Sequence, residues 1–345
     1  MEGQTVLKKG EVYFMKFIDN KGITDPKINL AIEEYILENF GETDSYLLFY
    51  VNKPSIIIGR NQNTIEEINT DFVEKEGISV VRRLSGGGAV YHDEQNLNFS
   101  FIQKDDGNSF QNFAKFLQPI IEVLNNLGVP AEMQGRNDVA VEGRKVSGNA
   151  MFSTKGRMFS HGTLMFDSEI EKVVSALKVR KEKIESKGIK SIRSRVANIS
   201  EYLEEKISMD EFKELILKHV FEVDDVEDVS EHILTEEDWK NIYEISENRY
   251  QKWEWNFGRS PAYNIQASHK FPAGLVDVRL DVQKGIIEHC TIYGDFFGIG
   301  NIRDLEEKLT GVRHNKQAIE EALDDIEVPH YLGKISKEEF VSLLY

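Results

Sequence analysis

The chain has 345 residues, of which 40% are hydrophobic and 29% charged, a composition typical of a soluble globular protein with room for two domains. The formal net charge of −17 argues against nucleic-acid binding, which needs a basic face. The lack of a long apolar run or signal-peptide core predicts a cytoplasmic protein without a membrane span.

The first part of the chain predicts a helix followed by several strands. Asp25-Pro26 is typical of a helix start, and apolar residues follow at helical spacing from residue 28 to 36. YLLFYV and SIIIG indicate two strands separated by the turn NKP. A short helix that ends at Gly77 then leads into a third strand, ISVVRR.

The middle of the chain continues this pattern. NLNFSFIQ places Leu97, Phe99 and Phe101 on one face of a strand, and apolar residues from 110 to 127 predict a long amphipathic helix closed by Gly128. From 131 to 167 the sequence indicates further strands, broken by the turns VEGR and STKGR.

The last third of the chain predicts a second, smaller domain. Residues 170 to 249 are charged and helical in character, and WEWNFGRSPAYN resembles a linker. VDVRLDVQKGIIEHCTIYG then predicts a hairpin, and two helical patterns follow it. We therefore expect an α+β first domain over residues 1–250 and a small α+β domain over residues 251–345.

Residues 82 to 93, RRLSGGGAVYHD, contain three consecutive glycines. Glycines 86 to 88 present backbone N–H groups without side-chain cover, which suits a phosphate oxygen. Arg82 and Arg83 add positive charge that could contact phosphate. The alternative is a glycine-rich turn with solvated arginines. The segment is neither a P-loop nor a dinucleotide-binding fingerprint.

A second candidate segment is GRNDVAVEGRKVSGNAMF, residues 135 to 152. Lys145 precedes an alternating stretch, so its amine could hold a carboxylate and a phosphate together. The alternative is an ordinary surface lysine near a turn. Asp138 lies either in a plain turn or beside phosphates as a Mg²⁺ ligand. His161 could line the same cleft, although a lone histidine in a strand is more often structural.

These segments and HGTLMFD, taken in order, closely resemble the lipoate–protein ligase family. The stretches SKGIKSIRSRVANI and WEWNFG are also similar to that family, so the resemblance spans nearly the whole chain. It implies a biotin/lipoate-ligase-like catalytic domain with a mixed sheet and flanking helices. It also implies the activation of lipoate by ATP to give lipoyl-AMP.

The resemblance further implies that the lipoyl group passes to a lysine of an apo lipoyl domain of a 2-oxo acid dehydrogenase or of the glycine-cleavage H protein. ATP would be a substrate, and Mg²⁺ would accompany it. The nucleotide-binding residues of the family match Arg83 and the run Gly88, Ala89, Val90 and Tyr91, and the lysine shared by ATP and lipoate matches Lys145. We expect His161 to contact lipoate as well. Leu84 and Tyr91 depart from some family members without altering the charges.

Two other functions remain open at this point. A cysteine-dependent octanoyl or lipoyl transferase of the same superfamily would need a nucleophilic cysteine in the first domain. The single cysteine, Cys290, lies in the second domain, where a small buried apolar role is expected. The chain could also be a non-catalytic module that binds lipoate or a nucleotide. A biotin ligase is disfavoured because no GRGR-type motif is present.

Overall fold

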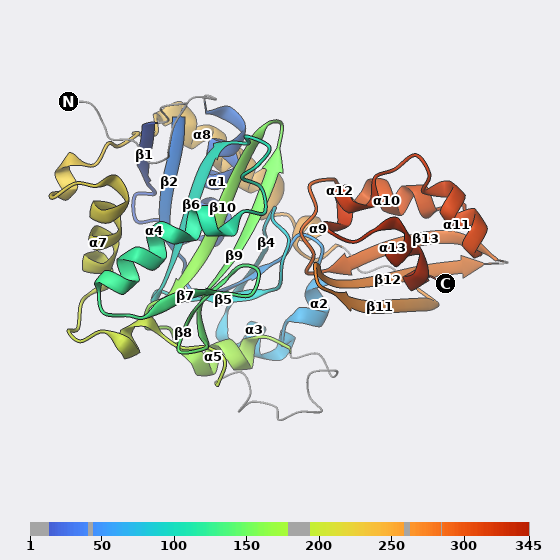
Figure 1. Ribbon diagram of the computed structural model, residues 1–345, viewed down its shortest axis with the longest axis horizontal. Coiled ribbons are helices and arrows are strands. Elements are labelled where there is room, and N and C mark those ends of the chain that lie inside the picture. The colour runs from blue at the N-terminus through green and yellow to red at the C-terminus, as the bar shows by residue number, and fades with distance from the viewer. Residues whose placement is uncertain (1–13, 41–43, 179–193, 259–262, 284, 345) are drawn as a thin grey trace. The chain divides into compact units, whose positions relative to one another are not determined.

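The computed structural model describes residues 14–40, 44–178, 194–258, 263–283 and 285–344 (Figure 1). The chain divides into two compact units. The first comprises Met1–Ile57, Ile68–Val81 and Val90–Lys252, and the second comprises Ile58–Glu67, Arg82–Ala89 and Trp253–Tyr345. Two segments from the first half of the sequence therefore group with the C-terminal part. The expected division into a catalytic domain, 1–250, and a small accessory domain, 251–345, stays a prediction.

The first unit is built on a mixed seven-stranded sheet. In spatial order its strands are β1 (Phe14–Asp19), β2 (Asp44–Val51), β6 (Asn96–Lys104), β10 (Arg157–Met165), β9 (Arg144–Thr154), β8 (Asp138–Val141) and β7 (Ala131–Gln134). β1 and β2 are parallel, and every later neighbouring pair in this order is antiparallel. A second sheet has the order β4 (Ser79–Arg82), β3 (Ser55–Ile58) and β5 (Val90–His92).

Alternation along β6 places one apolar face against the main core. Leu97, Phe99 and Phe101 are buried there together with apolar residues of α4 (Phe113–Asn126) and α7 (Met209–Phe221). Helix α1 (Pro26–Asn39) also contacts the sheet through β6 and β10. The Asp25 side chain caps α1 by accepting a hydrogen bond of 3.0 Å from the N–H of Lys27. The predicted start of this helix is therefore confirmed.

Shorter helices complete the first unit. They are α3 (Thr70–Glu76), α5 (Ile170–Ala176) and α8 (Glu236–Ile245). Gly77 ends α3 with a φ of 62°, the left-handed conformation that favours glycine. The predicted end of that helix is therefore also confirmed.

The second unit contains a three-stranded antiparallel sheet and a set of helices. The strands are β11 (Ile265–Phe271), β12 (Gly274–Gln283) and β13 (Ile286–Gly294). The helices are α2 (Thr64–Glu67), α9 (Trp253–Asn256), α10 (Ile302–Leu309), α11 (Lys316–Ala322), α12 (Val328–Leu332) and α13 (Lys337–Leu344). The predicted hairpin is β12–β13. The sequence prediction missed β11 and found two of the four described helices after β13.

Candidate active site

Arg82 is almost completely buried, at 1% exposure, so the interpretation of both arginines as solvated is wrong. Its guanidinium donates hydrogen bonds to the side chain of Thr64 and to carbonyls of two chain segments. The acceptors are Gly59 O, Arg60 O, Gln62 O, Thr64 Oγ1, Trp255 O and Asn256 O, at 2.7 to 3.3 Å. Arg82 therefore holds segment 58–67 and α9 together within the second unit.

Arg83 is also buried, and it donates to its own loop. Its Nε lies 2.9 Å from the hydroxyl of Ser85, and its Nη2 lies 2.6 and 2.9 Å from the carbonyls of Gly86 and Gly88. These hydrogen bonds of the guanidinium constrain the backbone of the glycine run. Its expected contact with a nucleotide stays a prediction.

The three glycines differ in what an added side chain would meet. A Cβ at Gly86 would lie 2.3 Å from the carbonyl oxygen of Phe296. Gly87 has a φ of 91°, and a Cβ there would lie 2.9 Å from Nη2 of Arg83. At Gly88 a Cβ would meet nothing within 4 Å. The packing of the chain therefore requires glycine at the first two positions, whereas Gly88 faces open space that a ligand could use.

The residues after the glycines become progressively buried. Ala89 and Val90 are half-buried, and Tyr91 is buried on β5. Among the residues that the structure describes, the Tyr91 hydroxyl has no hydrogen-bond partner. Burial raises the pKa of Tyr91 well above its usual value, and the nearby carboxylate of Asp93 adds to this, so the hydroxyl remains a donor at neutral pH.

Lys145 lies near the start of β9 in the first unit. Its Nζ is 2.8 Å from Oδ1 of Asp138, and the two side chains are 37% and 34% exposed. A Cβ at Gly148 would lie 2.8 Å from Nζ, so this glycine leaves room for the lysine to fold back over its own strand. The structure thus brings together Lys145, which is predicted to hold a carboxylate and a phosphate, and Asp138, which is predicted to bind Mg²⁺.

The backbone of Lys145 is fixed by a segment far along the chain. Its N–H donates to the carbonyl of Arg195 at 2.7 Å, and its carbonyl accepts from the N–H of Ala197 at 3.0 Å. Arg195 and Ala197 belong to the family-like stretch SKGIKSIRSRVANI, of which residues 186–193 lie outside the described part. Residues 194–199, the described end of this stretch, therefore help to fix the position of Lys145. The hydrophobic periodicity of the sequence does not indicate this role.

Asp138 is the only residue predicted to bind Mg²⁺. The described ranges contain no group of three or more His, Cys, Asp or Glu side chains that could hold a metal ion. Mg²⁺ is commonly held by one or two carboxylates together with substrate phosphates. A single half-exposed carboxylate beside Lys145 fits such a site when the nucleotide supplies the other ligands, and the assignment stays a prediction.

His161 forms a buried pair with Glu33 of α1. Its Nδ1 lies 2.9 and 3.1 Å from the two carboxylate oxygens, and both side chains are less than a tenth exposed. This contact agrees with the structural role that the sequence analysis weighed for a lone strand histidine, and the lipoate contact stays a prediction. Sequence reasoning missed Glu33, although its charge inside an apolar helical pattern was a signal.

The predicted residues fall into two groups, one in each compact unit. Lys145, Asp138 and His161 lie on strands of the first unit, as do Val90 and Tyr91. The segment Arg82–Ala89 belongs to the second unit. Cys290 is buried in the apolar core of the second unit, in accord with the small apolar role expected from the sequence. No helix in the described part of the chain is long and apolar enough to cross a membrane.

The amino-acid sequence matches known proteins over nearly its whole length. The family model for the lipoyl protein ligase A/B catalytic domain matches residues 25–221, and the model for the bacterial lipoate protein ligase C-terminus matches residues 260–344. A lipoate-protein ligase of Bacillus subtilis (strain 168) is 60% identical over 331 residues, which cover 96% of this chain and all of that protein.

Solved structures agree on the fold. A P. falciparum protein in complex with lipoate superposes with a TM-score of 0.77 at 24% identity, over 95% of this chain and 97% of that one. A lipoate-protein ligase A bound with ATP gives a TM-score of 0.61 at 26% identity, over 73% and 99%. A bi-partite lipoate protein ligase from Thermoplasma acidophilum, described with its E2 lipoyl domain, gives 0.63 at 28% identity, over 73% and 100%. The predicted α+β fold is confirmed, and the chain belongs to the lipoate–protein ligase family of enzymes.

Proposed function

We propose that this enzyme uses ATP to activate lipoate as lipoyl-AMP and then transfers the lipoyl group to a lysine of an apo acceptor protein. The observation that carries the proposal is the position of Lys145, whose amine lies 2.8 Å from Asp138 at the start of β9. The related lipoate-protein ligase A bound with ATP supports the nucleotide as one substrate, and the family to which the chain belongs supports lipoate as the other.

Lys145 is suited to the first half-reaction. The lipoate carboxylate attacks the α-phosphorus of ATP, so that a carboxylate–phosphate bond forms and pyrophosphate leaves. This step brings negative groups together, and a compact ammonium between them lowers that repulsion. Because the pair with Asp138 is about one third exposed, exchanging the carboxylate of Asp138 for that of a substrate costs little free energy.

The remaining residues would bind the two substrates. Arg83, Gly88 and Ala89 would contact the nucleotide through one segment, and Val90 and Tyr91 through the strand that follows it. The buried hydroxyl of Tyr91 is a donor without a described partner, which supports a polar contact there. His161, held by Glu33, would lie against lipoate. Mg²⁺, if held by Asp138, would supply charge neutralisation at the phosphates.

In the second half-reaction, the acceptor amine attacks the acyl carbon of lipoyl-AMP. The amide bond forms, AMP leaves, and the amine loses a proton. We infer that the acceptors are lipoyl domains of 2-oxo acid dehydrogenases and the glycine-cleavage H protein. A related ligase described with its E2 lipoyl domain supports the first of these classes.

The proposal is tested by incubating the enzyme with ATP, Mg²⁺, lipoate and a panel of apo acceptors. We expect lipoate-dependent release of pyrophosphate and, by mass spectrometry, one lipoyl group on the acceptor lysine. Reactions that lack ATP or lipoate serve as controls. Acceptor lipoylation without ATP would contradict the proposal.

A further inference from the structure

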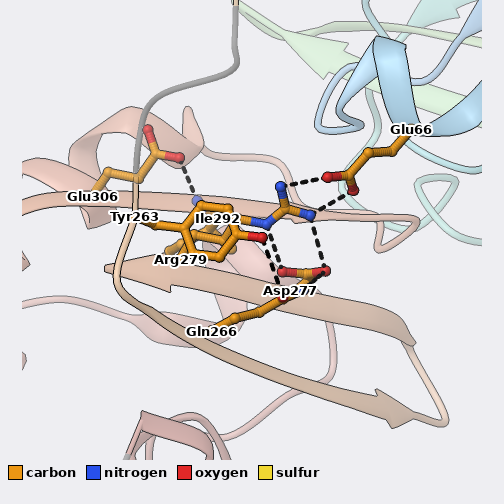
Figure 2. A network of polar contacts seen from close by, with 7 residues as sticks. All are labelled: Glu66, Tyr263, Gln266, Asp277, Arg279, Ile292 and Glu306. Atoms are coloured by element: carbon orange, nitrogen blue, oxygen red, sulfur yellow. Dashed lines mark hydrogen bonds and ion pairs between the residues drawn. The ribbon is translucent and has the colours of Figure 1, made fainter. Parts of the chain in front are cut away.

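Arg279 on β12 connects the C-terminal sheet to segment 58–67 (Figure 2). Its Nη1 and Nη2 lie 2.6 and 2.5 Å from the two carboxylate oxygens of Glu66 on α2. Its Nε lies 3.2 Å from Oδ1 of Asp277. A bidentate contact of this kind fixes both distance and orientation between the groups.

The guanidinium is also enclosed by aromatic rings. Its central carbon lies 4.8 Å from the ring centroid of Tyr263 and 4.7 Å from that of Tyr293, and the Arg279 side chain is only 4% exposed. Such surroundings hold the guanidinium in one orientation. The Arg279 side chain is therefore a rigid attachment point on the sheet.

Glu66 is not needed to neutralise this buried charge. The Asp277 side chain is 2% exposed and already pairs with Arg279, so one carboxylate balances one guanidinium. The carboxylate of Glu66, which is 39% exposed, is a second partner of the same guanidinium. Its bidentate contact therefore mainly serves to place its own segment, residues 58–67.

Segment 58–67 in turn lies directly against the glycine run. The N–H of Arg60 donates to the carbonyl of Ser85 at 2.9 Å. A Cβ at Gly59 would lie 1.9 Å from the carbonyl oxygen of Gly87, so the two backbones touch. Arg82 adds hydrogen bonds to the side chain of Thr64 and to carbonyls of the same segment. A displacement of α2 would therefore displace the glycine run.

We propose that Glu66 and Arg279 are positioning residues for nucleotide binding. They fix segment 58–67 on the C-terminal sheet, and this segment fixes the backbone of the glycine run. The inference rests on the proposed function, in which Arg83 and Gly88 contact ATP. It assigns to the C-terminal sheet a direct part in shaping a predicted nucleotide-binding segment.

The test is steady-state kinetics of the full-length Glu66→Ala enzyme in lipoate-dependent pyrophosphate release. Glu66 is changed because its side chain is partly exposed, whereas removal of buried Arg279 risks the fold. We expect the KM for ATP to rise on the order of tenfold, as for a lost charge-assisted contact. The KM for lipoate and the kcat at saturating ATP stay within about twofold of wild type. Glu66→Gln, which keeps an acceptor, should give a smaller rise.

Asp325→Ala is the matched control. It removes an exposed ion pair of the same unit, in which Lys308 Nζ lies 2.5 Å from Asp325, and it should leave both KM values unchanged. A lowered melting temperature in Glu66→Ala with an unchanged KM for ATP would show a purely structural contact and overturn the inference. An equal rise in both KM values would overturn it too. A wild-type enzyme without lipoate-dependent pyrophosphate release would overturn the proposed function, and this inference with it.

Discussion

Replacement of Lys145 by alanine separates a catalytic role from a structural one. The Lys145–Asp138 pair has about a third of each side chain exposed, so its loss should lower the free energy of unfolding by about 1 kcal/mol or less. Loss of a positive charge that stabilises the reacting phosphate costs a few kcal/mol, hence roughly a hundredfold or more in rate. We therefore expect Lys145→Ala to melt near the wild-type temperature and to lose lipoate-dependent pyrophosphate release.

The control for this prediction is Lys16→Ala. Lys16 forms an ion pair of the same length, 2.8 Å, with Asp44, and the two side chains are 31% and 26% exposed. The pair joins β1 and β2 of the same sheet, so its loss should cost similar stability and no activity. A Lys145→Ala enzyme that releases pyrophosphate at close to the wild-type rate would refute the assignment. So would an equal loss of rate in Lys16→Ala.

Three further predictions concern the glycine run, Arg82 and the cysteine. Gly88→Val should fold normally but bind ATP much more weakly in isothermal titration, whereas Gly86→Ala should lower the melting temperature because its Cβ would meet the carbonyl of Phe296. Unchanged ATP binding by a folded Gly88→Val protein would show that the glycine run is only a turn and does not bind the nucleotide. Arg82→Lys should destabilise the protein by about 3 kcal/mol in urea unfolding, since an ammonium cannot reach all the acceptors of a buried guanidinium; a loss below about 0.5 kcal/mol would contradict this. Cys290→Ser should keep most activity, and wild-type enzyme should show no acyl adduct on that residue by mass spectrometry; an adduct with loss of turnover in the mutant would favour the transferase.

Elements that depend on local chemistry were predicted from the sequence. The cap at Asp25 and the left-handed Gly77 are set by hydrogen bonds and backbone angles within a few residues. The alternation in β6 likewise records one apolar face. These signals lie within a single element, so one sequence is enough to find them.

Strand partners were not predicted, because pairing is decided by segments far apart in the chain. β2 and β3 are separated by a three-residue turn, yet β2 pairs with β1 and β6, whereas β3 pairs with β5 in another sheet. β11 was missed because its exposed face and its polar residues weaken the strand pattern. The contact of Glu66 with Arg279 joins residues 213 positions apart, and no local pattern marks it.

The different roles of the adjacent residues Arg82 and Arg83 do not follow from residue type alone. Both carry the same charge beside the same glycines, so phosphate binding was an equal expectation for each on residue type alone. The family resemblance selected Arg83. The structure supplies an independent reason to treat them differently, because Arg82 is used by six acceptors in two distant segments. Arg83 instead donates hydrogen bonds to the carbonyls of the glycine run itself. A ligand that displaces this run therefore changes the hydrogen bonds of Arg83 directly.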